Sequence, residues 1–357
     1  MRIAAWVVRE PAGPIERQDR DVVPGPEDVV VQVAGCGVCH TDLGFYHDGV
    51  PTRHPFPLTL GHEISGTVVQ TGPGAARWLD RSVIVPAVIP CGRCDACAAG
   101  RQSICGSQIF PGNDVHGGFA SHVLVPSHGL CAVPDLADSG QNPAGVDLAT
   151  LSVVADAVST PWQAIRRSGL AAGDLAVFVG IGGVGGFGAQ LAAAAGALVV
   201  AIDVDDDRLG ALASHGVTLA INAARSDFKR IRAAVRELAE QRGVPTWRRK
   251  IFETSGTTAG QSTAFGLLER GGWLSVIGFT PEKLELRLSN LMALDATAQG
   301  NWGCAPSLYP EIVTMALTGR VALAPFVEKR PLSSIAEAFE EIHARRARRR
   351  IILVPEA

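Results

Sequence analysis

A short glycine-rich segment, Gly180–Gly185, limits the fold of this chain more than any other feature. It follows the apolar run Ala176–Val179 and precedes the alanine-rich run Phe187–Ala195. Glycines between a buried strand and a helix let the backbone turn tightly and let a pyrophosphate come close to it. The next apolar run, Leu198–Ile202, ends at Asp203, 23 residues after the first glycine. We therefore predict a dinucleotide-binding βαβ unit.

The acid at the end of that second strand indicates which dinucleotide is bound. The Asp203 carboxylate can accept hydrogen bonds from the ribose hydroxyls and would repel a 2′-phosphate, so we expect NAD. Arg208 lies nearby, as either a solvated helix residue or a phosphate contact. The basic run Arg345–Arg350 is likewise a solvated helix end or an anion contact. The predicted cofactor-binding residues are Gly180, Gly182, Gly183, Val184, Gly185, Asp203, Arg208 and Arg350.

The rest of the chain shows two different sequence patterns, one before and one after about residue 150. Before about residue 150, short β-branched runs such as Ile3–Val8 and Val29–Val33 alternate with Pro and Gly, which is typical of an antiparallel, barrel-like domain. After it, strand-like and helix-like segments alternate, which is the periodicity of a doubly wound parallel sheet. These segments are Leu219–Asn222, Asp227–Arg242, Ile251–Glu253, Gly260–Leu268 and Trp273–Gly278. We expect an α/β protein of two domains.

Composition excludes several classes of partner. The chain has 357 residues, a formal net charge of −3 and 47% hydrophobic residues. This charge gives no reason to expect nucleic acid or an anionic membrane as a partner. The first apolar run is too short for a signal peptide, and no uncharged apolar run is long enough to span a bilayer. A cytoplasmic enzyme with a small-molecule substrate is the expectation.

Four of the eight cysteines lie within fifteen residues of one another. Cys91, Cys94, Cys97 and Cys105 follow the pattern C-x2-C-x2-C-x7-C on a glycine-bearing stretch. Four thiolates at this spacing can surround one zinc ion and leave no position for a substrate. An iron–sulfur cluster is the main alternative, but the last gap is long for it and no proline follows the fourth cysteine. We interpret the stretch as a structural zinc loop.

Cys39 and His62 indicate a second metal site. Thiolate and imidazole are ligands that zinc prefers, and both residues lie in turn-forming contexts. A third ligand must come from elsewhere in the chain. Asp156 interrupts the apolar run Leu148–Ala155, where an unpaired acid would be costly. It is either that ligand or a helix N-cap, and the residues alone do not choose.

Together these motifs resemble the zinc-dependent medium-chain alcohol dehydrogenases over essentially the whole chain. The resemblance implies a GroES-like β-barrel catalytic domain at residues 1–150, a Rossmann NAD-binding domain inserted at residues 151–295, and a C-terminal return to the catalytic domain at residues 296–357. It also implies two Zn²⁺ ions per subunit, NAD as cofactor and a homotetramer. The residues that carry it are Val38–Asp42, Gly61–Glu63, the four-cysteine loop, Gly180–Gly185 and Asp203.

The resemblance assigns roles at the second metal site. Asp156 becomes the third ligand of a catalytic zinc beside Cys39 and His62. Thr41 would hydrogen-bond the reacting oxygen and relay its proton, Asp42 would orient the ring of His62, and Glu63 would be an acid able to touch the metal. Some relatives end the relay with a histidine where this chain has Gly44. His47, another group or water would then end it.

Further segments resemble members that oxidise a cyclic allylic alcohol carried on coenzyme A, so an acyl-CoA substrate is expected. These are Cys36–Asp48, Val88–Cys94, Pro111–His122, Ser152–Pro161, Leu288–Ala293 and Gly300–Cys304. No residue is identifiable as a contact for the coenzyme A phosphates. Three other functions share the same motifs: a dehydrogenase of a free alicyclic or benzylic alcohol, a zinc-dependent hydratase, and a non-catalytic zinc- and nucleotide-binding protein.

Overall fold

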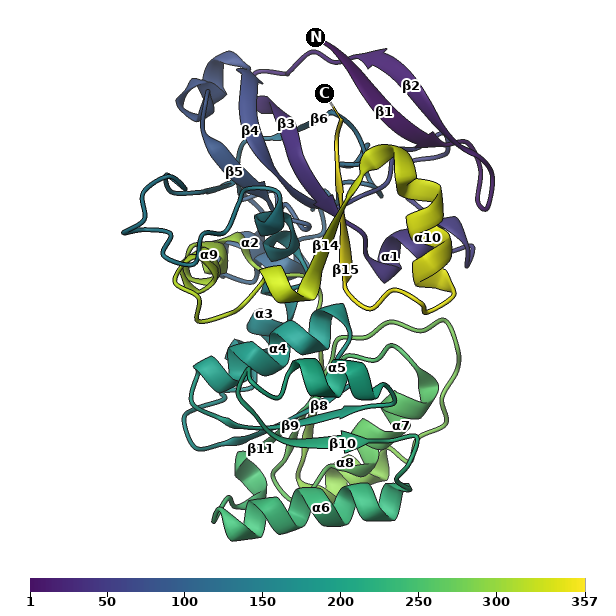
Figure 1. Ribbon diagram of the computed structural model, residues 1–357, viewed down its shortest axis with the longest axis vertical. Coiled ribbons are helices and arrows are strands. Elements are labelled where there is room, and N and C mark those ends of the chain that lie inside the picture. Colours follow the sequence, from purple (N-terminus) through teal and green to yellow (C-terminus); the bar gives the residue numbers. More distant parts are fainter. Residues whose placement is uncertain (357) are drawn as a thin grey trace. The chain divides into compact units, whose positions relative to one another are not determined.

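The computed structural model describes residues 1–356, which form two compact units (Figure 1). The first unit comprises Met1–Ser159, Gly303–Gly319 and the chain from Leu323 onward, and the second comprises Thr160–Trp302 with Arg320–Ala322. The second unit is therefore inserted into the first.

The units divide after Ser159 and Trp302, not at the expected residues 150 and 295. The first difference arises because the 3-10 helix η3 (Thr150–Ala155) is anchored in the first unit, where Tyr309 Oη donates to Ala155 O at 2.5 Å. The second arises because strand β13 (Thr297–Gly300) pairs with the inserted sheet.

A mixed sheet forms the centre of the first unit. Its strand order is β14-β15-β3-β4-β5-β7, with β6 paired to β3. β15 pairs antiparallel with β3, so the C-terminal segment returns to the N-terminal part of the chain. The strands are β3 (Asp28–Gly37), β4 (Glu63–Thr71), β5 (Ser82–Val85), β6 (His122–Pro126), β7 (Cys131–Ala132), β14 (Val327–Pro331) and β15 (Arg350–Val354).

An antiparallel pair of strands, β1 (Arg2–Val8) and β2 (Ile15–Asp21), forms a separate two-stranded sheet in this unit. β1 was predicted from its apolar residues. β2 was not, because its sequence IERQDRD is mostly polar. β2 exists because each of its residues pairs in register with one of β1.

The helices of the first unit are short. The α-helices are α1 (His40–Tyr46), α2 (Asp95–Ala98), α9 (Tyr309–Leu317) and α10 (Ile335–His343). The 3-10 helices besides η3 are η1 (Pro73–Trp78), η2 (Gln102–Ile104), η5 (Pro306–Leu308), η6 (Ala324–Phe326) and η7 (Leu332–Ser334).

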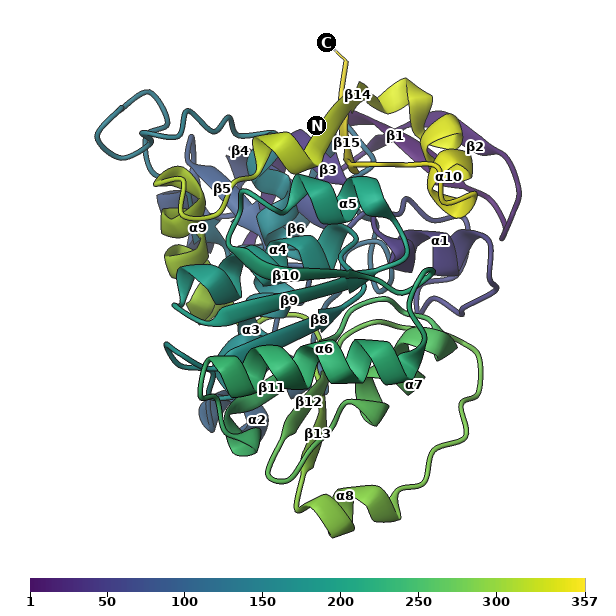
Figure 2. The same cartoon turned by 60° about the horizontal axis from the view of Figure 1, so that its bottom comes forward.

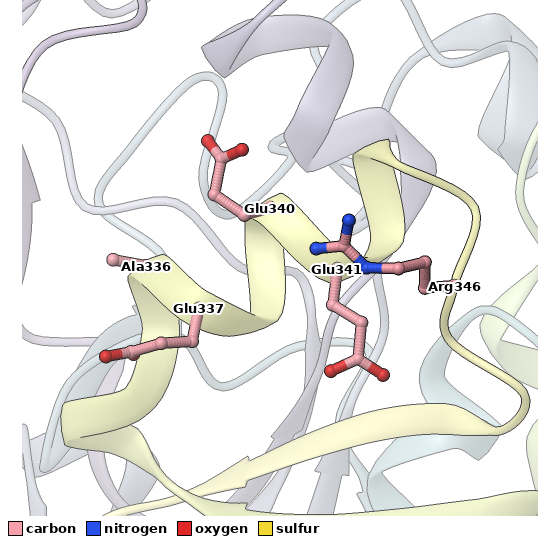
Figure 3. A pocket seen from close by; sticks show the side chains of 5 residues that line it. All are labelled: Ala336, Glu337, Glu340, Glu341 and Arg346. Atoms are coloured by element: carbon pink, nitrogen blue, oxygen red, sulfur yellow. The ribbon is translucent and has the colours of Figure 1, made fainter.

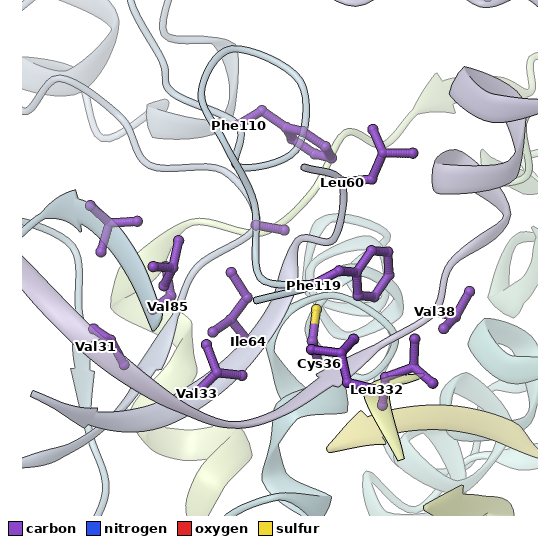
Figure 4. Packing of buried hydrophobic residues seen from close by; sticks show 14 of the residues in the cluster. Val31, Val33, Cys36, Val38, Leu60, Ile64, Val85, Phe110, Phe119 and Leu332 are labelled. Carbon is purple, nitrogen blue, oxygen red and sulfur yellow. The ribbon is translucent and has the colours of Figure 1, made fainter. Parts of the chain in front are cut away.

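Side chains from distant segments build the core of the first unit (Figure 4). Cys36 of β3, Ile64 of β4, Phe119 and Leu332 are all fully buried there. Packing is tight enough to dictate one residue type: Gly61 has φ +98°, and a Cβ on it would lie 2.8 Å from Cys36 Sγ. At Gly61, just before β4, the backbone conformation and the surrounding packing therefore both require glycine.

The second unit is built on a six-stranded parallel sheet. Its order is β10-β9-β8-β11-β12-β13, the 3-2-1-4-5-6 order of a dinucleotide-binding fold. Its strands are β8 (Leu175–Val179), β9 (Leu198–Asp203), β10 (Val217–Asn222), β11 (Arg249–Glu253), β12 (Trp273–Val276) and β13. Its helices are α3 (Ser159–Arg167), α4 (Gly183–Ala194), α5 (Asp206–Ala211), η4 (Thr246–Arg248), α6 (Phe228–Gln241), α7 (Thr258–Gly266) and α8 (Ser289–Leu294).

Residue patterns explain these elements. β8 is buried at every position, as expected for a central parallel strand. α6 buries Ile231, Val235 and Ala239, which recur every four residues and join the same core as the strands of the sheet. Asp227 caps it by accepting from Arg230 N at 2.8 Å. Figure 2 shows α6 lying along this sheet.

Within residues 1–356, none of the helices combines the length and the apolar character that a membrane span needs.

Candidate functional site

The first unit gathers four potential metal ligands from three distant segments. Cys39 is the N-cap of α1, Asp156 directly follows η3, and Glu63 is the first residue of β4, with His62 just before it. One ligand atom from each of these residues lies within 4.8 Å of every other. Asp156 Oδ2 is 3.8 Å from Cys39 Sγ and 3.6 Å from His62 Nε2. The three ligands of the expected catalytic zinc therefore lie together.

One buried atom indicates that this cluster suits a metal. His62 is fully buried, and its Nε2 has no hydrogen-bond partner among the described residues. A buried imidazole nitrogen without a hydrogen bond is costly, and a metal cation that displaces its proton would bind to its lone pair. A thiolate, an imidazole and a carboxylate around it are the ligand types of an open zinc site.

Asp42 holds the ligand segments in place. Its Oδ2 accepts from Cys39 N at 2.9 Å, and its Oδ1 accepts from Gly61 N at 3.1 Å and lies 3.2 Å from His62 Nδ1. Burial would lower the pKa of His62, but the charge of Asp42 and the side-chain contact with Asp156 outweigh it and raise the pKa well above its usual value. The negative surroundings favour positive charge at the ring, and Asp42 directs Nε2 toward the other ligands.

Glu63 has a partner that the sequence did not indicate. Arg350 Nε donates to Glu63 Oε2 at 2.7 Å, its Nη2 donates to Oε1, and Ala157 N also donates to Oε1 at 3.0 Å. All of these groups belong to the first unit. Arg350 was expected as a contact for a cofactor phosphate; in the structure its guanidinium pairs with Glu63. Glu63 is thereby held by three donors, and Cys39, His62 and Asp156 remain as the metal-binding set.

Thr41 lies beside this set, with its Oγ1 3.7 Å from Cys39 Sγ. Gly44 is buried within α1 and has no side chain to continue a proton relay. The ring of His47 stacks on His343 of α10 at 4.2 Å and lies 3.9 Å from Glu340. His47 is thus packed against α10.

A surface pocket lies along the same helix. It is lined by Ala336, Glu337, Glu340, Glu341 and Arg346 (Figure 3). None of these residues belongs to either metal-ligand cluster.

The four-cysteine loop forms the second cluster. Its four sulfur atoms lie within 4.8 Å of one another. Cys94 Sγ is 3.5 Å from Cys97 Sγ and 3.7 Å from Cys105 Sγ. Backbone N–H groups of Arg93 and Cys94 lower the pKa of Cys91 to about 6. Four sulfurs converging with one already poised as a thiolate fit a closed structural zinc site.

The predicted glycine turn has the expected strand-turn-helix setting in the second unit. Gly180 has φ +88°, and Gly182 is the N-cap of α4. A Cβ on Gly185 would lie 1.9 Å from the carbonyl oxygen of Gly180, so only glycine allows this close packing. A Cβ on Gly182 would lie 3.8 Å from Arg208 Nη1, which places this guanidinium next to the turn. Gly183 and Val184 begin α4.

Asp203 lies at the end of β9 and has a structural role as well. Its Oδ2 accepts from Ile181 N at 2.7 Å, and its Oδ1 accepts from Val204 N at 2.8 Å and Asp205 N at 3.0 Å. The carboxylate thus fastens the glycine turn to β9. Oδ2, which accepts one of these bonds, has a further lone pair that can accept a ribose hydroxyl.

Phe110 is one contact of the metal cluster that sequence reasoning missed. Its ring centroid lies 4.8 Å from that of His62. Phe110 carries no chemistry of its own and is separated from His62 in sequence, so no local pattern could have indicated the contact.

Comparisons with known proteins agree with both units. A family model for the alcohol dehydrogenase GroES-like domain matches residues 25–135, and one for zinc-binding dehydrogenases matches residues 183–318. An alcohol dehydrogenase of Geobacillus stearothermophilus is 29% identical over 91% of each chain. The NDMA-dependent alcohol dehydrogenase of Amycolatopsis methanolica is 30% identical over 96% of each chain. A solved alcohol dehydrogenase of Aeropyrum pernix is 27% identical, with a TM-score of 0.84 over 99% of this chain and 100% of that one.

Proposed function

We propose, since the chain belongs to the zinc-dependent medium-chain alcohol dehydrogenases, that it oxidises 6-hydroxycyclohex-1-ene-1-carbonyl-CoA to 6-oxocyclohex-1-ene-1-carbonyl-CoA. NAD would be the oxidant, and the step would belong to anaerobic benzoyl-CoA degradation. That the chain is an alcohol-oxidising enzyme follows from its family. The substrate and NAD are the parts proposed here.

The observation that carries the chemistry is the Cys39, His62 and Asp156 set, in which His62 Nε2 makes no hydrogen bond to any described residue. Three protein ligands leave room for a substrate oxygen, whereas four would close the site. Zinc held there would act as a Lewis acid that lowers the pKa of the substrate hydroxyl, and NAD held at the glycine turn would accept the hydride.

The side chains around this set have separate tasks. Asp42 fixes the ring of His62 and the backbone of Cys39. The Thr41 hydroxyl, next to the Cys39 sulfur, is placed to take the proton that the substrate hydroxyl loses. Arg350 and Ala157 N keep Glu63 oriented. The balance is one alcohol and NAD⁺ giving one conjugated ketone, NADH and one proton.

The acyl-CoA substrate is supported by the sequence segments that resemble such dehydrogenases, among them Cys36–Asp48 and Pro111–His122. NAD is supported by the carboxylate of Asp203 beside the glycine turn.

We also propose a cytoplasmic homotetramer. Its structural support is the edge strand β13 together with Leu288 and Met292 of the neighbouring segment, whose side chains are 69% and 77% exposed. An unpaired strand edge near exposed apolar side chains is suited to association between copies. Light scattering of the purified protein would test this assembly.

The deciding experiment follows NADH absorbance with 6-hydroxycyclohex-1-ene-1-carbonyl-CoA and, in parallel, with free cyclohex-2-enol. Higher kcat/KM for the thioester supports the proposal. Turnover of the free alcohol alone would make the enzyme a dehydrogenase of free alicyclic or benzylic alcohols. Consumption of the conjugated thioester without NADH would instead reveal a hydratase.

A further inference from the structure

A small cavity lies in the second unit, where side chains of α6 meet those of β8 and β11. Its volume is about 10 Å³, which is roughly the space that one water-sized particle needs. Val177 of β8 and Ile251 of β11, both fully buried, form part of an apolar wall. The charged side chains that line the cavity are those of Arg232, Arg236, Arg249 and Glu269.

This lining carries more positive than negative charge. Glu269 is the single acid among the described residues that line the cavity, and it faces three guanidinium groups. Both of its oxygens already accept hydrogen bonds, since Arg236 Nε donates to Oε1 at 2.5 Å and Arg249 Nη1 donates to Oε2. The one carboxylate is therefore shared by two of the three arginines, and the third is left over.

Arg232 is the arginine that remains without this acceptor. Its Nε atom is buried and has no hydrogen-bond partner within residues 1–356. Arg249 shows how such a group is ordinarily satisfied, because its Nε and Nη2 donate to Val244 O at 3.3 and 3.1 Å in addition to its bond with Glu269. A buried N–H group without an acceptor reduces stability, and proteins commonly supply the acceptor as water or an ion. Arg232 therefore calls for an acceptor from outside the chain.

Charge and size together indicate which acceptor fits. A water molecule would satisfy Nε of Arg232 but would leave the surplus positive charge in place. A monovalent anion would satisfy both, because guanidinium groups bind anions through charge-assisted hydrogen bonds. Phosphate and sulfate are too large for a space of about 10 Å³. Chloride is only slightly larger than water, and the side chain of Arg236, which is 44% exposed, can move outward to admit it.

We propose that a chloride ion binds between Arg232, Arg236 and Arg249. There it would accept from Arg232 Nε and link α6 to β11. The cavity residues belong neither to the glycine turn nor to the two metal-ligand clusters. The ion would therefore stabilise the second unit without taking part in the oxidation, and the site does not depend on the substrate that we propose.

The first test compares the wild type with Arg232→Met and Arg230→Met. Arg230 lies on the same helix, its side chain is 77% exposed, and it does not line the cavity, so its substitution removes the same charge from outside the site. Each protein is melted in sodium chloride and in sodium gluconate at equal ionic strength, which equalises general screening. A fixed, high concentration of NADH keeps the nucleotide site occupied in every sample.

The wild type and Arg230→Met should melt about 2–4 °C higher in chloride than in gluconate, because a ligand that binds only the folded state raises its stability. In Arg232→Met the difference should fall below about 1 °C. In gluconate this variant should melt no lower than the wild type, since a buried donor without an acceptor has been removed. An equal chloride effect in all three proteins, or none in the wild type, overturns the site.

A second test needs no variant, so it also decides the question if Arg232→Met does not fold. Crystals of the wild type are soaked in sodium bromide, because bromide replaces chloride and can be located by its anomalous scattering. An anomalous peak within hydrogen-bond distance of Arg232 Nε supports the proposal. A water molecule at that position, without anomalous signal, refutes it.

Discussion

Arg350 Nε donates to Glu63 Oε2 at 2.7 Å, and both side chains are buried beside the metal-ligand set. The two residues are 287 positions apart in sequence. This pair fastens the last strand, β15, to the first residue of β4, directly after His62. The C-terminal segment therefore takes part in building the site.

Replacing Arg350 with Met should destabilise the protein by about 3–5 kcal/mol, because Glu63 would remain buried without its counter-charge. Urea unfolding measures the change. The double variant Glu63→Gln/Arg350→Met should recover much of the loss, since no isolated charge remains. Arg349→Met, on the exposed neighbour, is the matched control. Equal stability of the Arg350 single variant and the wild type would contradict the pairing.

Cys39→Ala or His62→Ala should lower the zinc content by one ion per chain and abolish turnover while the fold is retained. Each substitution removes one of three ligands without disturbing the four-cysteine loop. Atomic emission spectroscopy measures the zinc content, NADH absorbance measures turnover, and circular dichroism shows whether the fold is retained. Cys131→Ala, at a buried cysteine outside both clusters, should keep all the zinc. Unchanged NADH formation in the ligand variants would reject the site.

Asp42→Asn should weaken zinc binding at the Cys39 site by about 10–100-fold, because the amide nitrogen cannot accept the hydrogen bonds that position the ligands. Competition with a chelator gives the affinity. Asp48→Asn changes an exposed carboxylate just beyond α1, the helix that contains Asp42, and should leave the zinc affinity unchanged. A wild-type affinity in Asp42→Asn would show that the orientation of His62 does not depend on Asp42.

In the metal-free protein, Cys91 should react with iodoacetamide with a half-maximal rate near pH 6. Its pKa is lowered to about 6 by backbone N–H groups, so its reactive thiolate is present above that pH and lost below it. Burial raises the pKa of Cys97 to about 12, so this thiol should stay unmodified at neutral pH. Peptide mass mapping distinguishes the two, and zinc should protect both. A Cys91 rate that still rises steeply above pH 8 would contradict the lowered pKa.

Asp203→Ser should reduce the preference for NAD over NADP by about tenfold or more, because the carboxylate no longer repels a 2′-phosphate and Arg208 lies beside the turn. The ratio of kcat/KM for the two cofactors is the measurement. Some loss of stability should accompany it, since three backbone N–H groups lose their charged acceptor. Asp207→Ser, on the adjacent helix, serves as control, and an unaltered ratio in Asp203→Ser would count against its assigned role.

Much of the fold was predictable because its signals are local. The apolar run of β8, the glycine turn and the helix expected within residues 227–242 each depend on neighbours in sequence, and all appear where expected. β2 was not predictable, because its polar residues are ordered only by pairing with β1.

The sequence by itself determined the four-cysteine loop and the glycine turn, because the residues of each lie close together in sequence. The short segments between them already limit where the ligating atoms can lie. Only the tertiary structure decided that Asp156 reaches Cys39 across 117 residues and that Arg350 pairs with Glu63. Such contacts arise when remote segments bury their apolar faces in one core, and the energy of that packing belongs to no single stretch of sequence.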